Sequence, residues 1–452
     1  MRKLITLLLC CVLSLTASAS TQRGSSQQTA TRPNIILIMA DDQGYETIGA
    51  NGGTSYKTPN IDRLAANGMR FENAYAHPLC TPSRVALMTG QYNFRNYTSF
   101  GELRLSEKTF GHMLRDAGYK TAIVGKWQLS ERDFQAPFHF GFDEYLLWHF
   151  GMRVNGVQTP GAQGSRYWDP VFYHDGKLLP NAKGKFGPDV MADFVEQYIQ
   201  KHQAEPFFLY YPLVLPHDPW IAPPGDPTPG EFPTEVTVAG TRGATPGDKE
   251  SEERQRRFAA MVEYADKLVG RVNAQLDTLK LSEKTLVIFT GDNGTFPALR
   301  STINGRQMNG AKGRPTDAGT HVPLIAQWKG QIPAGKVNQD LIDFTDFLPT
   351  LAEITGASLP AGVTVDGRSF APQLRGQKGE PREWIFCHYD PRWANFTFTR
   401  YAQDKQYKLY YDGVLYDYRQ DPLEKTPLAP TSLTPAQEQS RQKLQKVLDT
   451  LK

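Results

Sequence analysis

Two short, continuous apolar runs, each followed at once by acidic residues, constrain the fold of this chain more than any other feature. The first covers residues 33–40 and precedes Asp41 and Asp42, and the second covers residues 285–290 and precedes Asp292 and Asn293. Runs of this length without polar alternation are typical of strands buried on both faces of a parallel sheet. Ligands of open α/β sheets bind beyond the carboxyl ends of strands, so we expect one shared site.

Three further strand-like runs lie beside residues suited to binding an anion. Residues 120–124 precede Lys126, residues 207–215 precede His217, and residues 323–326 follow His321. The fold class expected is α/β, with a large, doubly wound, mixed but mostly parallel sheet flanked by helices. Apolar residues between Phe258 and Leu279 recur at helical spacing and predict a core-facing helix. We expect a catalytic domain at residues 32–376 and a smaller C-terminal α+β subdomain at residues 377–452.

The two acidic pairs offer only oxygen atoms as ligands. Carboxylate and amide oxygens suit a hard cation, and the prediction is calcium in preference to magnesium, held by Asp41, Asp42, Asp292 and Asn293. Each pair taken alone is more often a turn or a helix cap, because these residues favour both. Their appearance together, with the cysteine motif described below, favours a metal site.

The N-terminus predicts export. Residues 1–20 combine a basic start, an apolar run and small residues, as in a secretory signal peptide, and residues 21–31 form a polar linker. Lipoprotein anchoring at Cys10 or Cys11 is the alternative, although the small residues expected before such a cysteine are missing. No other segment predicts a membrane span. A cleaved chain keeps only Cys80 and Cys387, so we expect a secreted or periplasmic protein without disulfides.

A net charge of +3 is too small to indicate nucleic-acid binding, and the sequence has no run of lysine or arginine. Anion selectivity must therefore be local. Lys312 lies in a glycine-rich loop, where the backbone can bring its ammonium group close to a ligand. Cys80 opens the sequence Cys-Thr-Pro-Ser-Arg, which ends at Arg84, and residues 85–88 predict a helix whose positive N-terminus points at the site.

These motifs together resemble the type I, formylglycine-dependent sulfatases of the alkaline phosphatase superfamily. The Cys-x-Pro-x-Arg signature is accompanied by other matching segments in the same order. They are residues 34–42, 58–65, 80–90, 118–127, 291–294, 312–313, 346–351, 367–370 and 415–424.

The resemblance implies that a maturase converts Cys80 to formylglycine, whose hydrated form is the nucleophile and also faces the metal. It further implies that Arg84 holds the diol and that the two acidic pairs bind calcium. Lys126, His217 and Lys312 would contact the sulfate. Either His217 or Lys312 would protonate the leaving oxygen.

Two positions depart from the family pattern. Gln128 stands where a histidine is usual, and glutamine cannot take the proton that the histidine is thought to remove. His149 can act as a substitute base, the glutamine can orient the diol while the aldehyde forms more slowly, or the enzyme is inactive. His321 stands where arginine is commoner, which changes the charge near the site.

Aromatic and cationic residues in loops indicate a sugar substrate, although each aromatic ring taken singly is more often part of the core. The candidates are Tyr145, Trp148, Arg153, Tyr167, Trp168, Trp220, His388, Arg392 and Trp393. We expect a sulfated polysaccharide or oligosaccharide. Two alternatives stay open, a phosphonate or phosphodiester hydrolase of the same superfamily and a catalytically weak sulfoglycan-binding homologue.

Overall fold

The computed structural model describes residues 32–129, 134–148, 166–226 and 249–451, and the backbone of two short strands, β5 (Arg153–Val154) and β6 (Val157–Gln158). The predicted signal peptide at residues 1–20, the linker at residues 21–31, Cys10, Cys11 and His149 lie outside the described residues. Within the described part, no helix is long and apolar enough to cross a membrane.

A ten-stranded sheet forms the centre of the fold, in the order β14-β2-β13-β10-β1-β9-β3-β4-β7-β8. The central strands β10, β1, β9, β3 and β4 run parallel, whereas β13 and β7 are antiparallel to their neighbours. The bounds are β1 (Asn34–Ala40), β2 (Met69–Tyr75), β3 (Lys120–Gly125), β4 (Glu144–Trp148), β7 (Phe172–His174), β8 (Lys177–Leu178), β9 (Phe207–Pro212), β10 (Thr285–Gly291), β13 (Leu324–Gln327) and β14 (Lys336–Asp343). The predicted mixed, mostly parallel sheet is confirmed.

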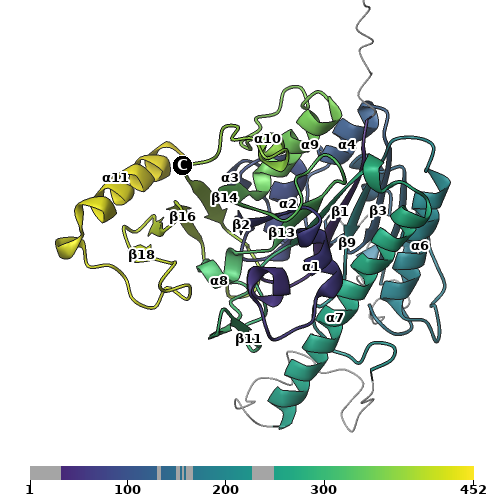
Figure 1. Cartoon of the computed structure of the whole chain (residues 1–452), viewed down its shortest axis with the longest axis horizontal. Helices are drawn as coiled ribbons and strands as arrows, with labels where there is room; N and C mark the ends of the chain where they lie inside the picture. Colours follow the sequence, from purple (N-terminus) through teal and green to yellow (C-terminus); the bar gives the residue numbers. More distant parts are fainter. Residues whose placement is uncertain are drawn as a thin grey trace, which may run out of the picture. The chain divides into compact units, whose positions relative to one another are not determined.

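Helices cover both faces of this sheet (Figure 1). Alternate residues of β1 point to opposite cores: Ile36 and Ile38 pack with α1 (Pro59–Ala66), α6 (Gly187–Lys201) and α7 (Lys249–Thr278). Ile35 and Leu37 pack with α2 (Cys80–Thr89), α4 (Phe110–Asp116) and α9 (Phe347–Thr355) on the other side. The helix predicted between Phe258 and Leu279 is α7, and its apolar stripe is buried against the sheet. The doubly wound architecture follows from this alternation.

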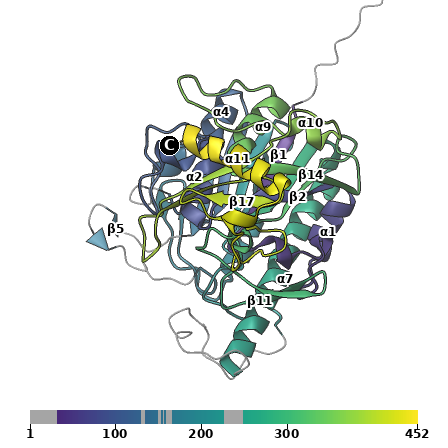
Figure 2. The ribbon, with the colours of Figure 1, turned by 90° about the vertical axis from the view of Figure 1, so that its left-hand side faces the viewer.

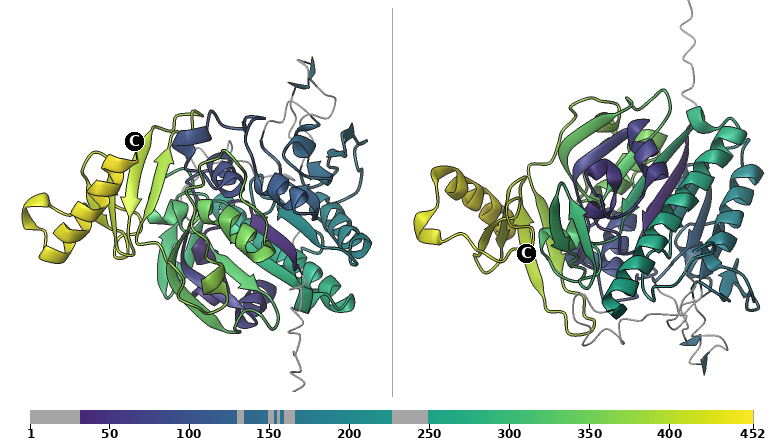
Figure 3. Two further views of the ribbon diagram at one scale, coloured as in Figure 1. Left: turned by 90° about the horizontal axis from the view of Figure 1, so that it is seen from above. Right: turned by 60° about the horizontal axis from the view of Figure 1, so that its bottom comes forward.

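A smaller four-stranded antiparallel sheet follows the main sheet along the chain. Its strands are β15 (Ile385–Tyr389), β16 (Thr399–Gln403), β17 (Tyr407–Tyr410) and β18 (Leu415–Asp417). Helix α11 (Pro435–Thr450) begins at a Thr434 cap and lies along one face of this sheet (Figures 2 and 3). The predicted C-terminal α+β subdomain is confirmed as a structure, and its boundary at residues 376 and 377 stays a prediction.

The second face of the small sheet packs beside the start of α2. Cys387, Tyr389 and Tyr401 form one buried cluster with Leu79, the residue before Cys80. The remaining elements are α3 (Asn93–Asn96), α5 (Ala136–His139), α8 (Asp317–Thr320), α10 (Ala371–Leu374) and the hairpin β11 (Arg300–Ile303) with β12 (Arg306–Asn309). The C-terminal sheet is therefore a neighbour of the cysteine motif.

Candidate functional site

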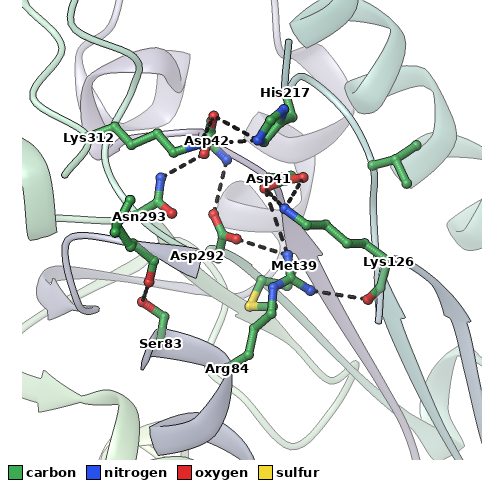
Figure 4. A network of polar contacts seen from close by, with 12 residues as sticks. Met39, Asp41, Asp42, Ser83, Arg84, Lys126, His217, Asp292, Asn293 and Lys312 are labelled. Atoms are coloured by element: carbon green, nitrogen blue, oxygen red, sulfur yellow. Dashed lines mark hydrogen bonds and ion pairs between the residues drawn. The ribbon is translucent and has the colours of Figure 1, made fainter. Parts of the chain in front are cut away.

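The carboxyl ends of β1 and β10 bring the two acidic pairs together. Ala40 pairs with Gly291 in parallel register, so Asp41 and Asp292 leave adjacent strands at the same level. The Asp42 backbone N–H donates to Oδ1 of Asp292 at 3.0 Å, and Nδ2 of Asn293 donates to Oδ1 of Asp42 at 2.9 Å (Figure 4). All four side chains are buried, and they form one cluster of polar oxygen atoms.

The donor set of this cluster fits a hard cation. Oδ1 of Asn293 is buried and has no hydrogen-bond partner among the described residues, although Nδ2 of the same side chain donates to Asp42 and to the Gly294 carbonyl. Carboxylate oxygens of Asp41 and Asp42 and a ring nitrogen of His217 lie within 4.8 Å of one another. A buried acceptor without a donor is costly, and a cation would satisfy it.

Three cationic side chains surround the carboxylates. Lys126 Nζ donates to both oxygens of Asp41 at 2.8 Å, and Lys312 Nζ donates to Oδ2 of Asp42 at 2.5 Å. Arg84 reaches Oδ2 of Asp292 at 2.9 Å from α2. Each carboxylate thus has its own cation, which offsets the desolvation of its charge.

The buried charges shift the ionisation of the cluster. Burial favours the neutral carboxyl, but the charges of Lys126 and Arg84 outweigh it at Asp41, whose pKa is lowered. Burial and the neighbouring Asp41 charge raise the pKa of Asp292 to about 6. Burial, helped by the positive charge of Lys312, lowers the pKa of His217, which is therefore neutral near pH 7.

His217 and Lys312 are close enough to exchange a proton. Lys312 Nζ lies 3.2 Å from Nε2 of His217, and Nδ1 of His217 contacts the Asp218 carbonyl at 2.6 Å. Burial favours the neutral amine, but the charge of Asp42 outweighs it and raises the pKa of Lys312. The pair therefore places a protonated amine against a neutral imidazole.

The helix predicted over residues 85–88 is α2, which begins earlier than that run, at Cys80. The helix N-terminus carries unpaired backbone N–H groups and favours an anion. Cys80 is a buried free thiol whose pKa is raised by burial, an effect that the nearby charges of Lys126 and Lys312 oppose. α2 ends at Gly90, whose φ of 68° lies in the left-handed region that glycine tolerates.

Gln128 occupies an unusual backbone position in the loop after β3, three residues beyond the end of that strand. Its φ is 56°, which is uncommon for a residue with a side chain, and its side chain is buried. Its Oε1 has no hydrogen-bond partner. Strain and an unsatisfied polar atom at one residue are typical of a functional position.

Two of the other predicted substrate residues, His321 and His388, pack against aromatic rings. His321 stacks between Tyr45 and Tyr75, with ring centroids 4.0 and 4.9 Å away, and its Nε2 contacts the Glu72 carbonyl at 2.8 Å. It precedes β13, whose antiparallel direction puts the start of that strand at the same sheet edge as the carboxyl end of β10, and its ring is held there between the two tyrosines. His388 contacts the Phe398 ring edge at 5.3 Å.

Most of the aromatic candidates for sugar contact belong to the core. Tyr145, Trp148, Tyr167 and Trp220 are buried, and Trp168 is partly buried. Side chains that do not reach the surface cannot stack on a sugar ring. Trp393 and Arg392, in contrast, are exposed.

Arg166 joins the site without being predicted from the sequence. Its Nη1 lies 3.6 Å from Oδ2 of Asp41, and its guanidinium lies 4.2 Å from the centroid of Trp148. It comes from a loop and not from a strand end, so strand-end reasoning does not find it. Its only signal in the sequence is its place directly before the predicted Tyr167 and Trp168 pair.

The site is a buried cluster of carboxylates and cationic side chains at one edge of the sheet. Comparison with known proteins shows which family the chain belongs to. The family profile described as sulfatase matches residues 33–357. The chain belongs to the sulfatase family. The profile described as N-sulphoglucosamine sulphohydrolase, C-terminal, matches residues 316–452. The predicted resemblance to type I sulfatases is therefore confirmed.

Curated sulfatases are similar to this family member over most of its length. N-acetylgalactosamine-6-sulfatase of Canis lupus familiaris is 32% identical over 372 residues, covering 76% of this chain and 66% of that enzyme. Arylsulfatase A of Homo sapiens is 35% identical over 388 residues, covering 79% of this chain and 70% of that enzyme. The match thus spans about two thirds of each relative.

Solved structures share the fold. A complex with D-glucosamine-2-N,6-O-disulfate has a TM-score of 0.73 at 22% identity, covering 93% of this sulfatase and 98% of that chain. The phosphonate monoester hydrolase of Agrobacterium radiobacter has a TM-score of 0.69 at 21% identity, covering 93% and 95%. At this level of identity the likeness establishes architecture alone.

Proposed function

We propose that this sulfatase hydrolyses a sulfate ester on a sulfated polysaccharide or oligosaccharide. The observation that carries the proposal is the convergence of Lys126, Lys312 and Arg84 on one buried cluster beside the N-terminus of α2. Such a group of cations fits the compact, anionic sulfate group of an ester. The sulfated sugars handled by the curated relative and by the solved complex support the substrate class.

The proposal includes two groups that complete the site. Formylglycine at Cys80 supplies a hydrated aldehyde hydroxyl as a nucleophile for sulfur, and calcium supplies positive charge against the ester oxygens. Asp41, Asp42, Asp292 and Asn293 would hold the cation, with the modified Cys80 side chain facing it. The unpartnered Oδ1 of Asn293 and the oxygen-only donors support a hard cation, which we propose to be calcium.

The protein's own residues then have distinct roles. Lys126 and Lys312 bind and orient the sulfate oxygens, and Arg84 holds the diol in place from the first turn of α2. Because Lys312 Nζ and Nε2 of His217 lie 3.2 Å apart, either group can deliver a proton to the leaving sugar oxygen, and the other can replace it.

Gln128 takes the place of the usual histidine as a positioning residue in this proposal. Its buried, unpartnered Oε1 can accept a hydrogen bond from a diol hydroxyl. It cannot remove that proton, so we expect release of sulfate to be slower than attack on sulfur. His149 stays the candidate substitute base, and His321, His388 and Arg392 stay predicted substrate contacts.

The test is a comparison of ester classes on one preparation of protein. Release of sulfate from sulfated oligosaccharides should exceed release of phosphonate or phosphate from matched phenyl esters by at least about a hundredfold. Faster phosphoryl release would favour the phosphonate or phosphodiester hydrolase, whose fold this chain shares. Tight glycan binding with no turnover of either class would favour the sulfoglycan-binding homologue that Gln128 motivates.

The proposal extends to maturation and location. A formylglycine-generating maturase must act on Cys80 before folding, because that thiol is buried in the folded chain. Export by residues 1–20 to the periplasm or the medium would bring the protein to extracellular polysaccharides. Detection of a mature N-terminus near residue 20 tests export, whereas acylation of Cys10 or Cys11 would show lipoprotein anchoring.

A further inference from the structure

Three aromatic rings stack in a row at the surface, and we call them the aromatic platform: Phe100, Trp393 and Phe396. Phe100 and Trp393 lie 4.3 Å apart between centroids with a 14° interplanar angle, and Trp393 and Phe396 lie 5.9 Å apart at 23°. Trp393 is 46% exposed and Phe396 is 37% exposed. Partly exposed rings that lie nearly parallel to one another differ from the buried core aromatics described above and need a separate explanation.

Two contacts tie the platform to the catalytic cluster from opposite sides. The backbone N–H of Gly101, next to Phe100, donates to Oγ1 of Thr81 at 3.2 Å, and Thr81 follows Cys80. The ring of Phe396 covers Gly313, where an added β-carbon would lie 2.4 Å from it. Because Gly313 follows Lys312, the platform adjoins residues next to both Cys80 and Lys312.

The loop that carries the platform is held in place before any ligand arrives. Tyr97 donates from its hydroxyl to the Pro391 carbonyl at 2.8 Å, and Arg392 Nη1 donates to the Thr98 carbonyl at 2.9 Å. Arg392 also pairs with Asp390 at 2.8 Å. These contacts join the loop between β15 and β16 to the segment after α3, so binding would order few additional groups.

We infer that the aromatic platform binds the pyranose ring that neighbours the sulfated sugar, so that the protein prefers an oligosaccharide to a small sulfate ester. This inference rests on the proposed function. The exposed parts of the Trp393 and Phe396 rings can accept the C–H face of a pyranose, while the exposed Arg392 suits anionic substituents and the partly exposed Asp390 suits hydroxyl groups. Continuity with Cys80 and Lys312 places this occupant one sugar unit from the reacting ester.

The experiment compares substrates and variants. Trp393→Ala with Phe396→Ala is assayed for sulfate release from chondroitin 6-sulfate, heparin and ι-carrageenan hexasaccharides and from 4-nitrophenyl sulfate. We expect kcat/KM on the best hexasaccharide to fall about tenfold, which corresponds to about 1.4 kcal/mol, with less than about twofold change on 4-nitrophenyl sulfate. Trp393→Phe should retain most of the hexasaccharide activity.

Leu359→Ala is the matched control, because Leu359 is an exposed apolar side chain of 46% exposure outside the platform. Equal losses of kcat/KM on the hexasaccharide and on 4-nitrophenyl sulfate would overturn the inference. The platform residues would then affect only the stability of the fold and not the binding of a neighbouring sugar. No loss on the hexasaccharide, or the same loss in Leu359→Ala, would also overturn it.

A binding measurement separates this inference from the proposed function. Native gels that contain each sulfated glycan should retard the unmodified protein more than the double variant, whether or not sulfate is released. Retardation without turnover of any ester would reject the proposed function and keep the platform. Equal migration of both proteins, or a dimer in sedimentation that the double variant loses, would overturn the platform as a sugar site.

Discussion

Nζ of Lys126 lies 2.8 Å from each carboxylate oxygen of Asp41, and both side chains are buried. A buried pair of this kind depends on both charges, since removing one leaves the other desolvated without compensation. The same lysine is proposed to bind sulfate. Lys126 is therefore expected to affect both stability and activity, and calcium should separate the two effects.

Lys126→Met removes the charge and keeps much of the side-chain volume. We expect sulfate release to fall at least about a hundredfold, and the melting temperature in a metal chelator to fall because Asp41 loses its partner. Calcium should recover much of the lost stability by neutralising Asp41. Lys329→Met, at a surface ion pair, is the control and should change neither quantity measurably.

Calcium should stabilise the folded protein through the oxygen cluster. Thermal unfolding is followed in chelator, calcium and magnesium, and the expected order of melting temperatures is calcium above magnesium above chelator. Asn293→Ala should reduce the calcium-dependent increase, since it removes the unpartnered Oδ1. An unchanged melting temperature across all three conditions would reject the metal site.

Calcium affinity should depend on pH in a defined direction. Burial raises the pKa of Asp292 to about 6, so its folded carboxyl binds a proton more tightly than in the unfolded chain. In metal-free protein this stabilising contribution is lost as pH rises through about 6. Protons compete with the cation, so calorimetry should show tighter calcium binding at pH 7.5 than at pH 5. Equal calcium affinity at pH 7.5 and at pH 5 would contradict the assignment of Asp292 as a calcium ligand.

Gln128→His tests the missing base. An imidazole at this buried position can accept the proton that the amide cannot, so kcat is expected to rise by about tenfold or more near neutral pH. The dependence of kcat on pH should gain an ionisation with a pKa near that of an ordinary histidine. If kcat and its pH profile are unchanged, slow release of sulfate is not caused by Gln128.

A buried ion pair joins the small sheet to the α8 segment. Lys408 Nζ lies 2.8 Å from Oε1 of Glu424, with both side chains almost fully buried, and Glu424 also accepts from the Asp317 backbone N–H. Lys408→Met should destabilise the fold by about 3–5 kcal/mol in chemical denaturation, because Glu424 is left unpaired. A loss below about 1 kcal/mol would show that the pair behaves like an exposed one.

Sequence patterns predicted the site where its residues follow strands or a short motif. Continuous apolar runs identified β1 and β10, and parallel register then required Asp41 and Asp292 to meet. The apolar run at residues 85–88 likewise predicted a helix beside the cysteine motif, and that helix is α2. Predictions of this kind need only the position of one strand or helix and the direction in which the chain runs through it.

Positions that depend on long-range packing were not predictable in this way. Trp148 and Trp220 are aromatic residues near loops, and only the fold decides that they are buried. The ring of His321 is held between Tyr45 and Tyr75, and Arg166 reaches Asp41 from a loop. Ring stacking and loop path depend on distant partners, which single-sequence patterns do not contain.

Peptide mass spectrometry of the protein from a host that carries a formylglycine-generating maturase tests the central claim most directly. The tryptic fragment Phe71 to Arg84 contains Cys80. The account predicts an aldehyde in place of the thiol in the fraction of molecules that releases sulfate. An intact Cys80 thiol in protein that still releases sulfate would contradict it.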